Sequence, residues 1–119
     1  MKKILIIEDD PVQQKTYRLK LWTKYNLDFA STGGEMLSQL GPTLPNLVIL
    51  DIMLPGGKNG FDILSLLKDN PKTSSIPVII LTNLGVDQRQ TALDCGAADY
   101  FTKIDTGMDQ IADIVKKYI

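Results

Sequence analysis

Residues 47–51 read LVILD, which is four consecutive apolar side chains followed at once by an acid. The runs ILII at residues 4–7 and VIIL at residues 78–81 have the same character, with no polar residue in alternation. A strand inside a parallel sheet is covered by helices on both faces, so all of its side chains are buried. The three runs therefore predict the central strands of a parallel sheet.

Two shorter runs, Leu27–Ala30 and Tyr100–Thr102, extend the set to five predicted strands, the first of which spans Lys3–Ile7. Helix-like segments separate the strands, and an apolar stripe over residues 108–118 is typical of a final amphipathic helix. Strand and helix thus alternate five times. Right-handed crossovers build such a chain into a doubly wound sheet, so we expect one α/β domain over residues 1–119.

Local signals mark several helix ends. Asp10 before Pro11 predicts a capped helix start, because proline at the first helical position loses no hydrogen bond. The segments TGGE at residues 32–35 and DQRQ at residues 87–90 have the spacing of capping boxes. Gly96 stands where the helix after residue 87 should end, and we expect a left-handed cap there.

The composition excludes several classes of function. With 13 basic and 14 acidic residues the net charge is −1, so no basic field is available for binding a nucleic acid. The first apolar run meets three acids at residues 8–10, which fits neither a signal peptide nor a membrane span. Because Cys95 is the only cysteine, no internal disulfide can form, and we expect a cytoplasmic protein.

Polar residues of complementary chemistry follow the predicted strands. Glu8 and Asp9 come after the first, Asp51 after the third, Thr82 after the fourth and Lys103 after the fifth. In an open parallel sheet these ends meet at one edge, where ligands bind. Two carboxylates about 4 Å apart repel by about 4 kcal/mol at an effective dielectric of about 20, so a cation is expected among them. Mg²⁺ is the economical choice for oxygen ligands.

Asp51 is the candidate nucleophile of this group. A carboxylate can attack phosphorus and form an aspartyl phosphate, and the equatorial oxygens then need neutralisation. Lys103 can pair with those oxygens and the Thr82 hydroxyl can donate to them. Alone, Thr82 would be a turn residue and Lys103 a surface lysine, but their joint placement favours a function.

Four stretches resemble the response-regulator receiver domains, a family that includes the chemotaxis regulators. They are ILIIEDDP at residues 4–11, LVILDIMLPG at residues 47–56, LTNLG at residues 81–85 and CGAADYFTK at residues 95–103. They occur in the family's order over nearly the whole chain, which is far more specific than a lone motif. The resemblance implies a flavodoxin-like (βα)5 fold with strand order 2-1-3-4-5.

The resemblance also implies a phosphorylation site. Asp51 would accept a phosphoryl group from the phosphohistidine of a sensor histidine kinase or a phosphotransfer protein. Mg²⁺ would be bound by Glu8, Asp9, Asp51 and the backbone carbonyl of Met53. The domain would be a signalling protein that assists its own phosphotransfer and dephosphorylation, not an enzyme with a separate substrate.

The remaining family roles concern the response to phosphorylation. Lys103 would contact the phosphoryl group, and Thr82 and Tyr100 would switch the face formed by the fourth helix, fifth strand and fifth helix toward a downstream protein. From the residues alone, Tyr100 could equally be a strand aromatic that only packs. A homodimer through the switch face stays open.

Three features depart from the family pattern. Ile104 replaces the usual proline, so we expect a trans peptide after Lys103, because a cis bond before a non-proline residue costs about 3 kcal/mol. The apolar residues Met53 and Leu84 cannot position a water, which predicts a long-lived phosphorylated state. The loop over residues 55–60 is longer than usual and predicts a small bulge at its glycines.

Other readings of the fold fit less well. A phosphohydrolase of the haloacid dehalogenase type needs a second acid where Met53 stands, and flavin or NAD binding needs a phosphate loop where this chain has acids. The alternative that remains is a receiver-like interaction module that is never phosphorylated. Trp22 is expected to pack in the first helix, and Cys95 to be a buried or half-buried helix residue.

Overall fold

Five parallel strands form one sheet in the order β2-β1-β3-β4-β5, within the residues that the computed structural model describes, 1–55 and 59–119 (side chains of residues 37–39 excepted). The strands are β1 (Lys3–Ile7), β2 (Asn26–Ala30), β3 (Leu47–Leu50), β4 (Val78–Thr82) and β5 (Asp99–Thr102). The helices are α1 (Pro11–Leu21), α2 (Gly33–Gln39), α3 (Gly60–Asp69), α4 (Arg89–Asp94) and α5 (Met108–Tyr118), with single 3-10 turns η1 (Val86–Gln88) and η2 (Lys103–Asp105).

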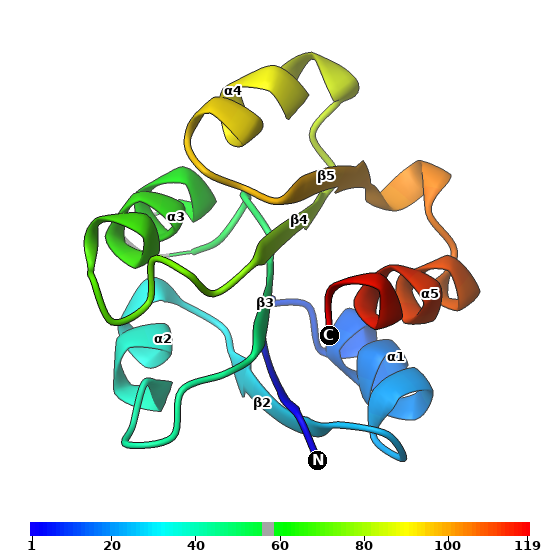
Figure 1. Ribbon diagram of the computed structural model, residues 1–119. Helices are drawn as coiled ribbons and strands as arrows, with labels where there is room; N and C mark the ends of the chain where they lie inside the picture. The colour runs from blue at the N-terminus through cyan, green and yellow to red at the C-terminus, as the bar shows by residue number, and fades with distance from the viewer. Residues whose placement is uncertain (56–58) are drawn as a thin grey trace.

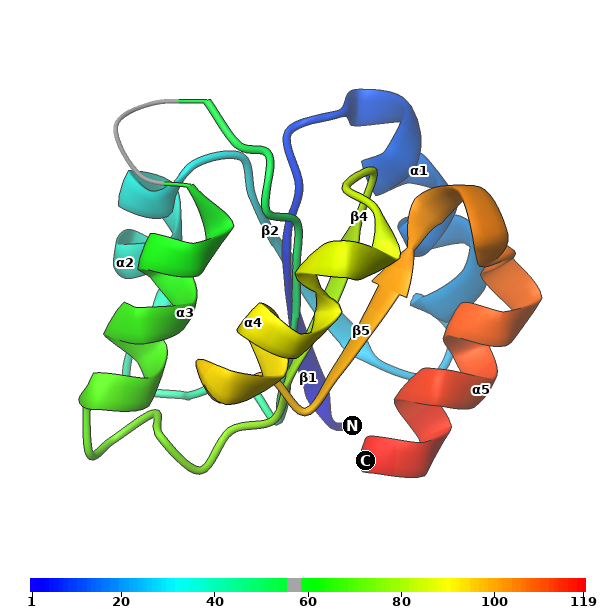
Figure 2. The same ribbon diagram turned by 90° about the horizontal axis from the view of Figure 1, so that it is seen from above.

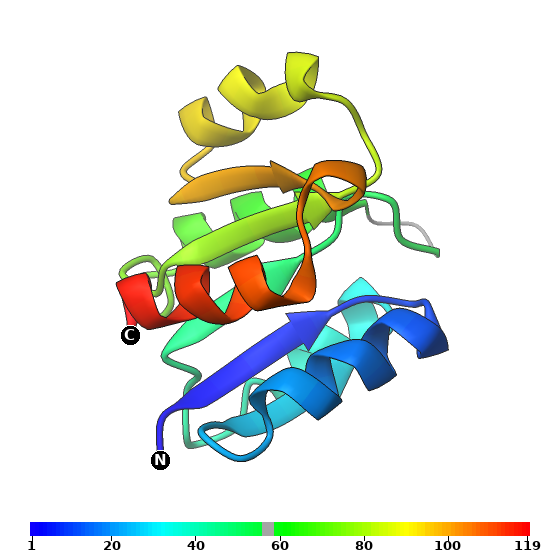
Figure 3. The ribbon, with the colours of Figure 1, turned by 90° about the vertical axis from the view of Figure 1, so that its right-hand side faces the viewer.

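Helices cover both faces of the sheet (Figure 1). α1 and α5 pack on one face, where they lie side by side (Figure 3), and α2, α3 and α4 pack on the other. Every side chain of β3 and β4 is buried as a result. The predicted α/β class, strand order and fully buried central strands are confirmed.

The strand register brings the polar strand ends together. Ile7 of β1 lies opposite Leu50 of β3, and Thr82 of β4 lies opposite Thr102 of β5. The residues that follow each strand therefore leave the sheet at the same edge, and the turns after β1, β4 and β5 gather there (Figure 2). This edge carries the candidate site.

Two of the predicted helix starts carry their caps. The Asp10 side chain caps α1, and the Thr32 hydroxyl accepts a hydrogen bond from the Glu35 N–H at 3.1 Å at the start of α2. Glu35 reaches back to the N–H of Ser31 at 2.7 Å, one residue before the partner that a capping box would give it. The local sequence thus fixes where both helices begin.

The predicted capping box at residues 87–90 is wrong. Its first residues lie in η1, which has no side-chain cap, and α4 begins only at Arg89. Contacts with β5 explain the difference: the Tyr100 hydroxyl donates to the Gly85 carbonyl at 2.9 Å, and the Arg89 guanidinium donates to the Tyr100 carbonyl at 2.6 Å. Tertiary contacts hold this turn in a tighter form than the capping box would.

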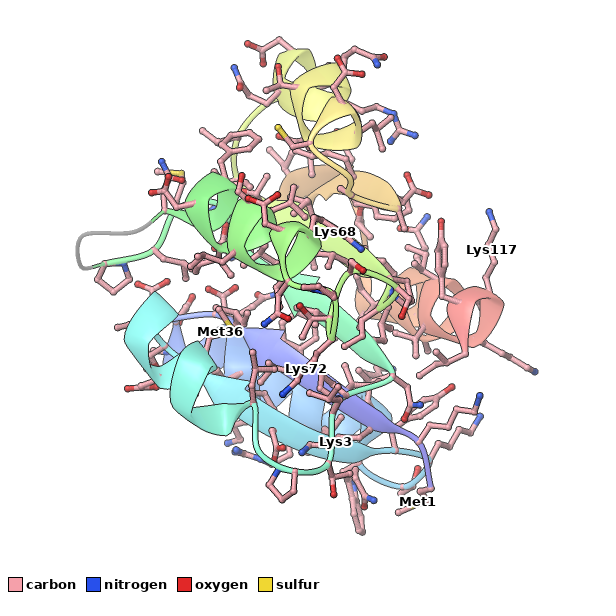
Figure 4. All side chains as sticks on the ribbon, turned by 60° about the vertical axis from the view of Figure 1, so that its left-hand side comes forward. Met1, Lys3, Met36, Lys68, Lys72 and Lys117 are labelled. Atoms are coloured by element: carbon pink, nitrogen blue, oxygen red, sulfur yellow. The ribbon has the colours of Figure 1, made fainter. Side chains whose placement is uncertain are left out.

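Gly96 ends α4 with φ of +106°, as predicted. A Cβ at this position would also lie 2.9 Å from Cγ of Lys68, so the glycine is required for space as well as for conformation. Lys68, labelled in Figure 4, lies on α3 and donates to the carbonyls of Ser74 and Ile76 at 3.1 and 2.7 Å. Burial lowers the pKa of the Lys68 ammonium, which is consistent with this enclosed position.

Two packing predictions are wrong. Trp22 is 60% exposed, because the inward stripe of α1 is formed by Tyr17 and Leu21, and the next residue along the helix turns toward solvent. Cys95 is exposed as well, since it follows α4 at the C-cap while Ala92 takes the buried position.

Three smaller predictions complete the comparison. The Lys103–Ile104 peptide is trans, as expected, because the described residues contain no cis bond. The bulge expected within residues 55–60 falls largely on residues 56–58, outside the described residues. In the part of the chain that the structure describes, no helix has the length and apolar content to cross a membrane.

Candidate functional site

Three carboxylates meet at the carboxyl edge of the sheet. Glu8 and Asp9 follow β1 and Asp51 follows β3, and one oxygen from each lies within 4.8 Å of the others. The backbone enforces this proximity, because the Asp51 N–H donates to the Ile7 carbonyl at 3.0 Å and the Glu8 N–H donates to the Ala30 carbonyl at 2.9 Å. The predicted convergence of the strand ends is therefore what the fold produces.

Two of the three acids are shielded from solvent. Glu8 is 2% exposed and Asp51 is 5% exposed, whereas Asp9 is open to solvent. Burial raises the pKa of Glu8 to about 7, and the negative charge of Asp51 adds to this effect. The carboxylate pair thus carries an electrostatic cost that a bound cation would relieve.

Lys103 already supplies one positive charge to this pair. Its ammonium contacts Glu8 and donates to the Asp51 carboxylate at 2.8 Å. Burial by itself lowers the pKa of Lys103, but the hydrogen bonds to Asp51 and Glu8 outweigh it, so the pKa is raised. The lysine expected to contact the phosphoryl group therefore contacts both Asp51 and Glu8 in this structure.

The backbone after Asp51 is closely packed. The Asp51 carboxylate accepts a hydrogen bond from the Met53 N–H at 3.1 Å, while the Met53 side chain points into solvent. Gly60, at the start of α3, donates its N–H to the Ile52 carbonyl at 2.8 Å. A Cβ on Gly60 would lie 2.3 Å from the Asp51 carbonyl oxygen, so only glycine allows this approach.

Thr82 ends β4, the strand beside β3, and Tyr100 lies on β5, one strand further out; neither residue is hydrogen-bonded to the acids. Thr82 is fully buried, and its hydroxyl accepts from the Leu84 N–H at 3.4 Å. Tyr100 is buried against the α2, α3 and α4 face and donates its hydroxyl to the Gly85 carbonyl. Burial raises the pKa of Tyr100, and the charges of Asp87 and Asp51 raise it further. Tyr100 therefore packs inward in this structure, against the turn after β4.

The donor set fits a hard divalent cation. Three carboxylates and one ammonium leave a net charge of −2, and all the acidic ligands are oxygens. Mg²⁺ favours such ligands and normally keeps several waters, for which the exposed Asp9 side of the site leaves room. The expected ligand group of Glu8, Asp9 and Asp51 is thus assembled.

Two residues near the acids gave no usable signal in the sequence. Gly60 looks like an ordinary glycine before a helix, and its role depends on the approach of α3 to β3. Gln14 looks like an ordinary polar residue of α1, yet its amide donates to the Glu8 carbonyl at 2.6 Å. Neither contact could be derived without the packing of helix against sheet.

Comparison with known proteins decides the family. The profile of the response regulator receiver domain matches residues 4–116. This chain belongs to that family. Its relatives include the response regulator PleD of Caulobacter vibrioides, which is 35% identical over 85% of this chain and 22% of PleD.

Two solved structures resemble this chain in their three-dimensional fold. The Mn²⁺-bound form of response regulator Rcp1 has a TM-score of 0.82 at 27% identity, over 98% of this chain and 91% of that one. The phosphorylated cyanobacterial phytochrome response regulator RcpA has a TM-score of 0.82 at 26% identity, over 98% of this chain and 89% of that one.

Membership in the receiver-domain family defines the general role of this chain. Receiver domains are signalling modules of two-component systems, in which phospho-aspartate formation and Mg²⁺ or Mn²⁺ binding are general properties. They interact with sensor kinases or phosphotransfer proteins and with downstream effectors. The chain spans less than half the length of the first curated relatives it matches.

Proposed function

We propose that this receiver domain accepts a phosphoryl group on Asp51 from a phosphohistidine of a sensor kinase or phosphotransfer protein. The observation that carries the proposal is the buried Asp51 carboxylate, which receives the Lys103 ammonium at 2.8 Å beside two further acids. Glu8, Asp9, Asp51 and the Met53 carbonyl would hold Mg²⁺, which when bound neutralises charge on the phosphoryl oxygens.

Asp51, Lys103 and Thr82 have separate roles in the proposed reaction. An Asp51 oxygen forms the new bond to phosphorus while the bond from phosphorus to the donor's imidazole nitrogen breaks and that nitrogen keeps the electron pair. Lys103 moves from two carboxylate partners to a developing phosphoryl oxygen, which is a short displacement from its present position. The Thr82 hydroxyl, now bonded only weakly to the Leu84 N–H, is available to donate to another such oxygen.

Exposed apolar side chains around the acids support a protein as phosphodonor. Val12, Met53 and Ile104 are all exposed, and each lies within three residues of Asp9, Asp51 or Lys103 in the sequence. Because these three segments all follow strands that end at the edge carrying the acids, we propose that the three side chains form an apolar rim that contacts the phosphodonor protein. This rim accounts for the partner part of the proposal.

The output surface is the face formed by α4, β5 and α5. A cavity of about 480 Å³ lies there, with Tyr100 and Phe101 in its lining beside Arg89. We assign Thr82 and Tyr100 as the coupling residues, because β4, which ends at Thr82, lies between β3 and β5, and Tyr100 of β5 belongs to this face. A Thr82 hydroxyl drawn toward phosphorylated Asp51 would release the turn after β4, against which Tyr100 is held.

Intact-mass spectrometry tests the proposal directly. The chain is incubated with Mg²⁺ and acetyl phosphate, and we expect a mass increase of one phosphoryl group that is absent without the metal. Asp51→Asn is the matched control, since it keeps the shape of the side chain and removes the nucleophile. An unmodified wild-type mass, or equal labelling of the asparagine variant, would instead favour an interaction module that is never phosphorylated.

A further inference from the structure

Gln14 connects two turns at the edge of the sheet that carries the acids. It lies on the second turn of α1 and is half-buried. Its side-chain amide donates to the Glu8 carbonyl at 2.6 Å and to the Ser31 hydroxyl at 3.3 Å. Because a carbonyl can only accept, the NH₂ group of the amide must face Glu8.

The Glu8 carbonyl belongs to the peptide that joins Glu8 to Asp9. The N–H of Glu8 is fixed separately by the Ala30 carbonyl at 2.9 Å. With both backbone groups of Glu8 held, the chain has little freedom in the direction it gives the next side chain. The exposed Asp9 carboxylate therefore depends on this peptide for its position toward Asp51.

We propose that Gln14 is a positioning residue for the divalent cation, acting through the Glu8–Asp9 peptide; the inference rests on the proposed metal-dependent function. Groups that orient metal ligands without touching the ion commonly change affinity about 10–100-fold when removed. Gln14 meets that description from outside the ligand group. Through Ser31 it also ties the turn after β1 to the turn after β2.

The test compares Gln14→Met with Gln110→Met in the intact chain. Gln110 also bonds a backbone group through its side chain, accepting from the Gly107 N–H at 2.8 Å, but it lies on α5 away from the acids. Isothermal titration with Mg²⁺ should show binding weakened about tenfold by Gln14→Met. The Gln110 variant should stay within about twofold of wild type, because the sites are independent.

Further readouts separate positioning from general stability. Urea unfolding without divalent ions reports stability alone, and a residue that only stabilises the fold would lower the midpoint and leave Mg²⁺ affinity unchanged. With acetyl phosphate, the labelling rate of Gln14→Met should approach that of wild type once Mg²⁺ is saturating. If Gln14→Met does not fold, Gln14→Ala replaces it, because the smaller side chain lets a water satisfy the Glu8 carbonyl. The expected loss of Mg²⁺ affinity is the same for this variant.

The outcomes distinguish this inference from the proposed function. If wild type binds Mg²⁺ and is labelled while Gln14→Met binds the metal as wild type does, the positioning role is wrong and the proposed function stands. If wild type neither binds Mg²⁺ nor takes up phosphate, both are wrong. Ser31→Ala, which leaves the bond to Glu8 in place, should weaken binding less than Gln14→Met does, and an equal loss would contradict a role through the Glu8–Asp9 peptide.

Discussion

Gly60→Ala is the substitution for which the structure gives the sharpest expectation. The added Cβ would lie 2.3 Å from the Asp51 carbonyl oxygen and 2.5 Å from Cα of Ile52. Both obstacles are backbone atoms, so no side-chain rotation can relieve the overlap. To reach ordinary contact, α3 and the Asp51 peptide must separate by about 1 Å.

The free-energy cost can be worked from that separation. Overpacking in a closed site costs about 1–3 kcal/mol, and weakening the 2.8 Å hydrogen bond from Gly60 to the Ile52 carbonyl adds about 1 kcal/mol. The lower conformational entropy of alanine in the unfolded chain returns about 0.4–1 kcal/mol. We therefore expect a net loss of about 1–3 kcal/mol in the free energy of unfolding, measured by urea titration.

The same movement displaces Asp51, so function should suffer beyond stability. A misplacement of about 1 Å can slow a reaction about 100-fold, and labelling by acetyl phosphate should fall at least tenfold under conditions where the variant is folded. Gly34→Ala is the matched control. Its nearest neighbour would be the Thr32 hydroxyl at 3.8 Å, and we expect stabilisation of up to about 1 kcal/mol. A Gly60→Ala protein with wild-type stability and labelling rate would refute the reasoning.

Three further predictions concern the charges and the rim of the site. Lys103→Met should lower the free energy of unfolding by about 3–5 kcal/mol at pH 8 without divalent ions, because two buried carboxylates lose their cation; urea titration that shows no loss would contradict this. In wild type, Glu8 binds its proton more tightly when folded, so its contribution to stability falls as pH rises from 4.5 to about 7; unfolding curves across that range in EDTA should show the decrease, and a constant or rising contribution would count against it. Met53→Asn should shorten the lifetime of phosphorylated Asp51, because an amide can hold a water that methionine cannot; decay of the labelled mass measures it, and an unchanged decay would remove the idea that Met53 and Leu84 protect the phosphoryl group.

The residues at the strand ends could be predicted because their position depends only on the strand pattern. Once ILII and LVIL are identified as neighbouring parallel strands, Glu8 and Asp51 must emerge at one edge. Helix starts with a local cap, such as those at Asp10 and Thr32, could be predicted equally well. In each case the determining interaction lies within a few residues or follows from strand pairing.

What could not be predicted depends on contacts between distant segments. The start of α4 is decided by β5, because Tyr100 bonds Gly85 and Arg89, which lie 15 and 11 residues before it in the chain. An aromatic side chain such as that of Trp22 is expected to pack in the core, but the orientation of α1 leaves it exposed to solvent. Gly60 and Gln14 gain their roles only when helices are placed against the sheet.

The carboxylate group is held together by the backbone and not by attraction among its members. The Asp51 N–H donates to the Ile7 carbonyl, the Glu8 N–H to the Ala30 carbonyl and the Gly60 N–H to the Ile52 carbonyl, so every acceptor lies outside the group. Sheet pairing therefore imposes the repulsion, and the acids cannot separate without loss of strand hydrogen bonds. The only low-cost responses are proton uptake by Glu8, the ammonium of Lys103 or a bound cation. A site built in this way stays ready for a divalent ion, because the fold has already supplied the free energy needed to bring its ligands together.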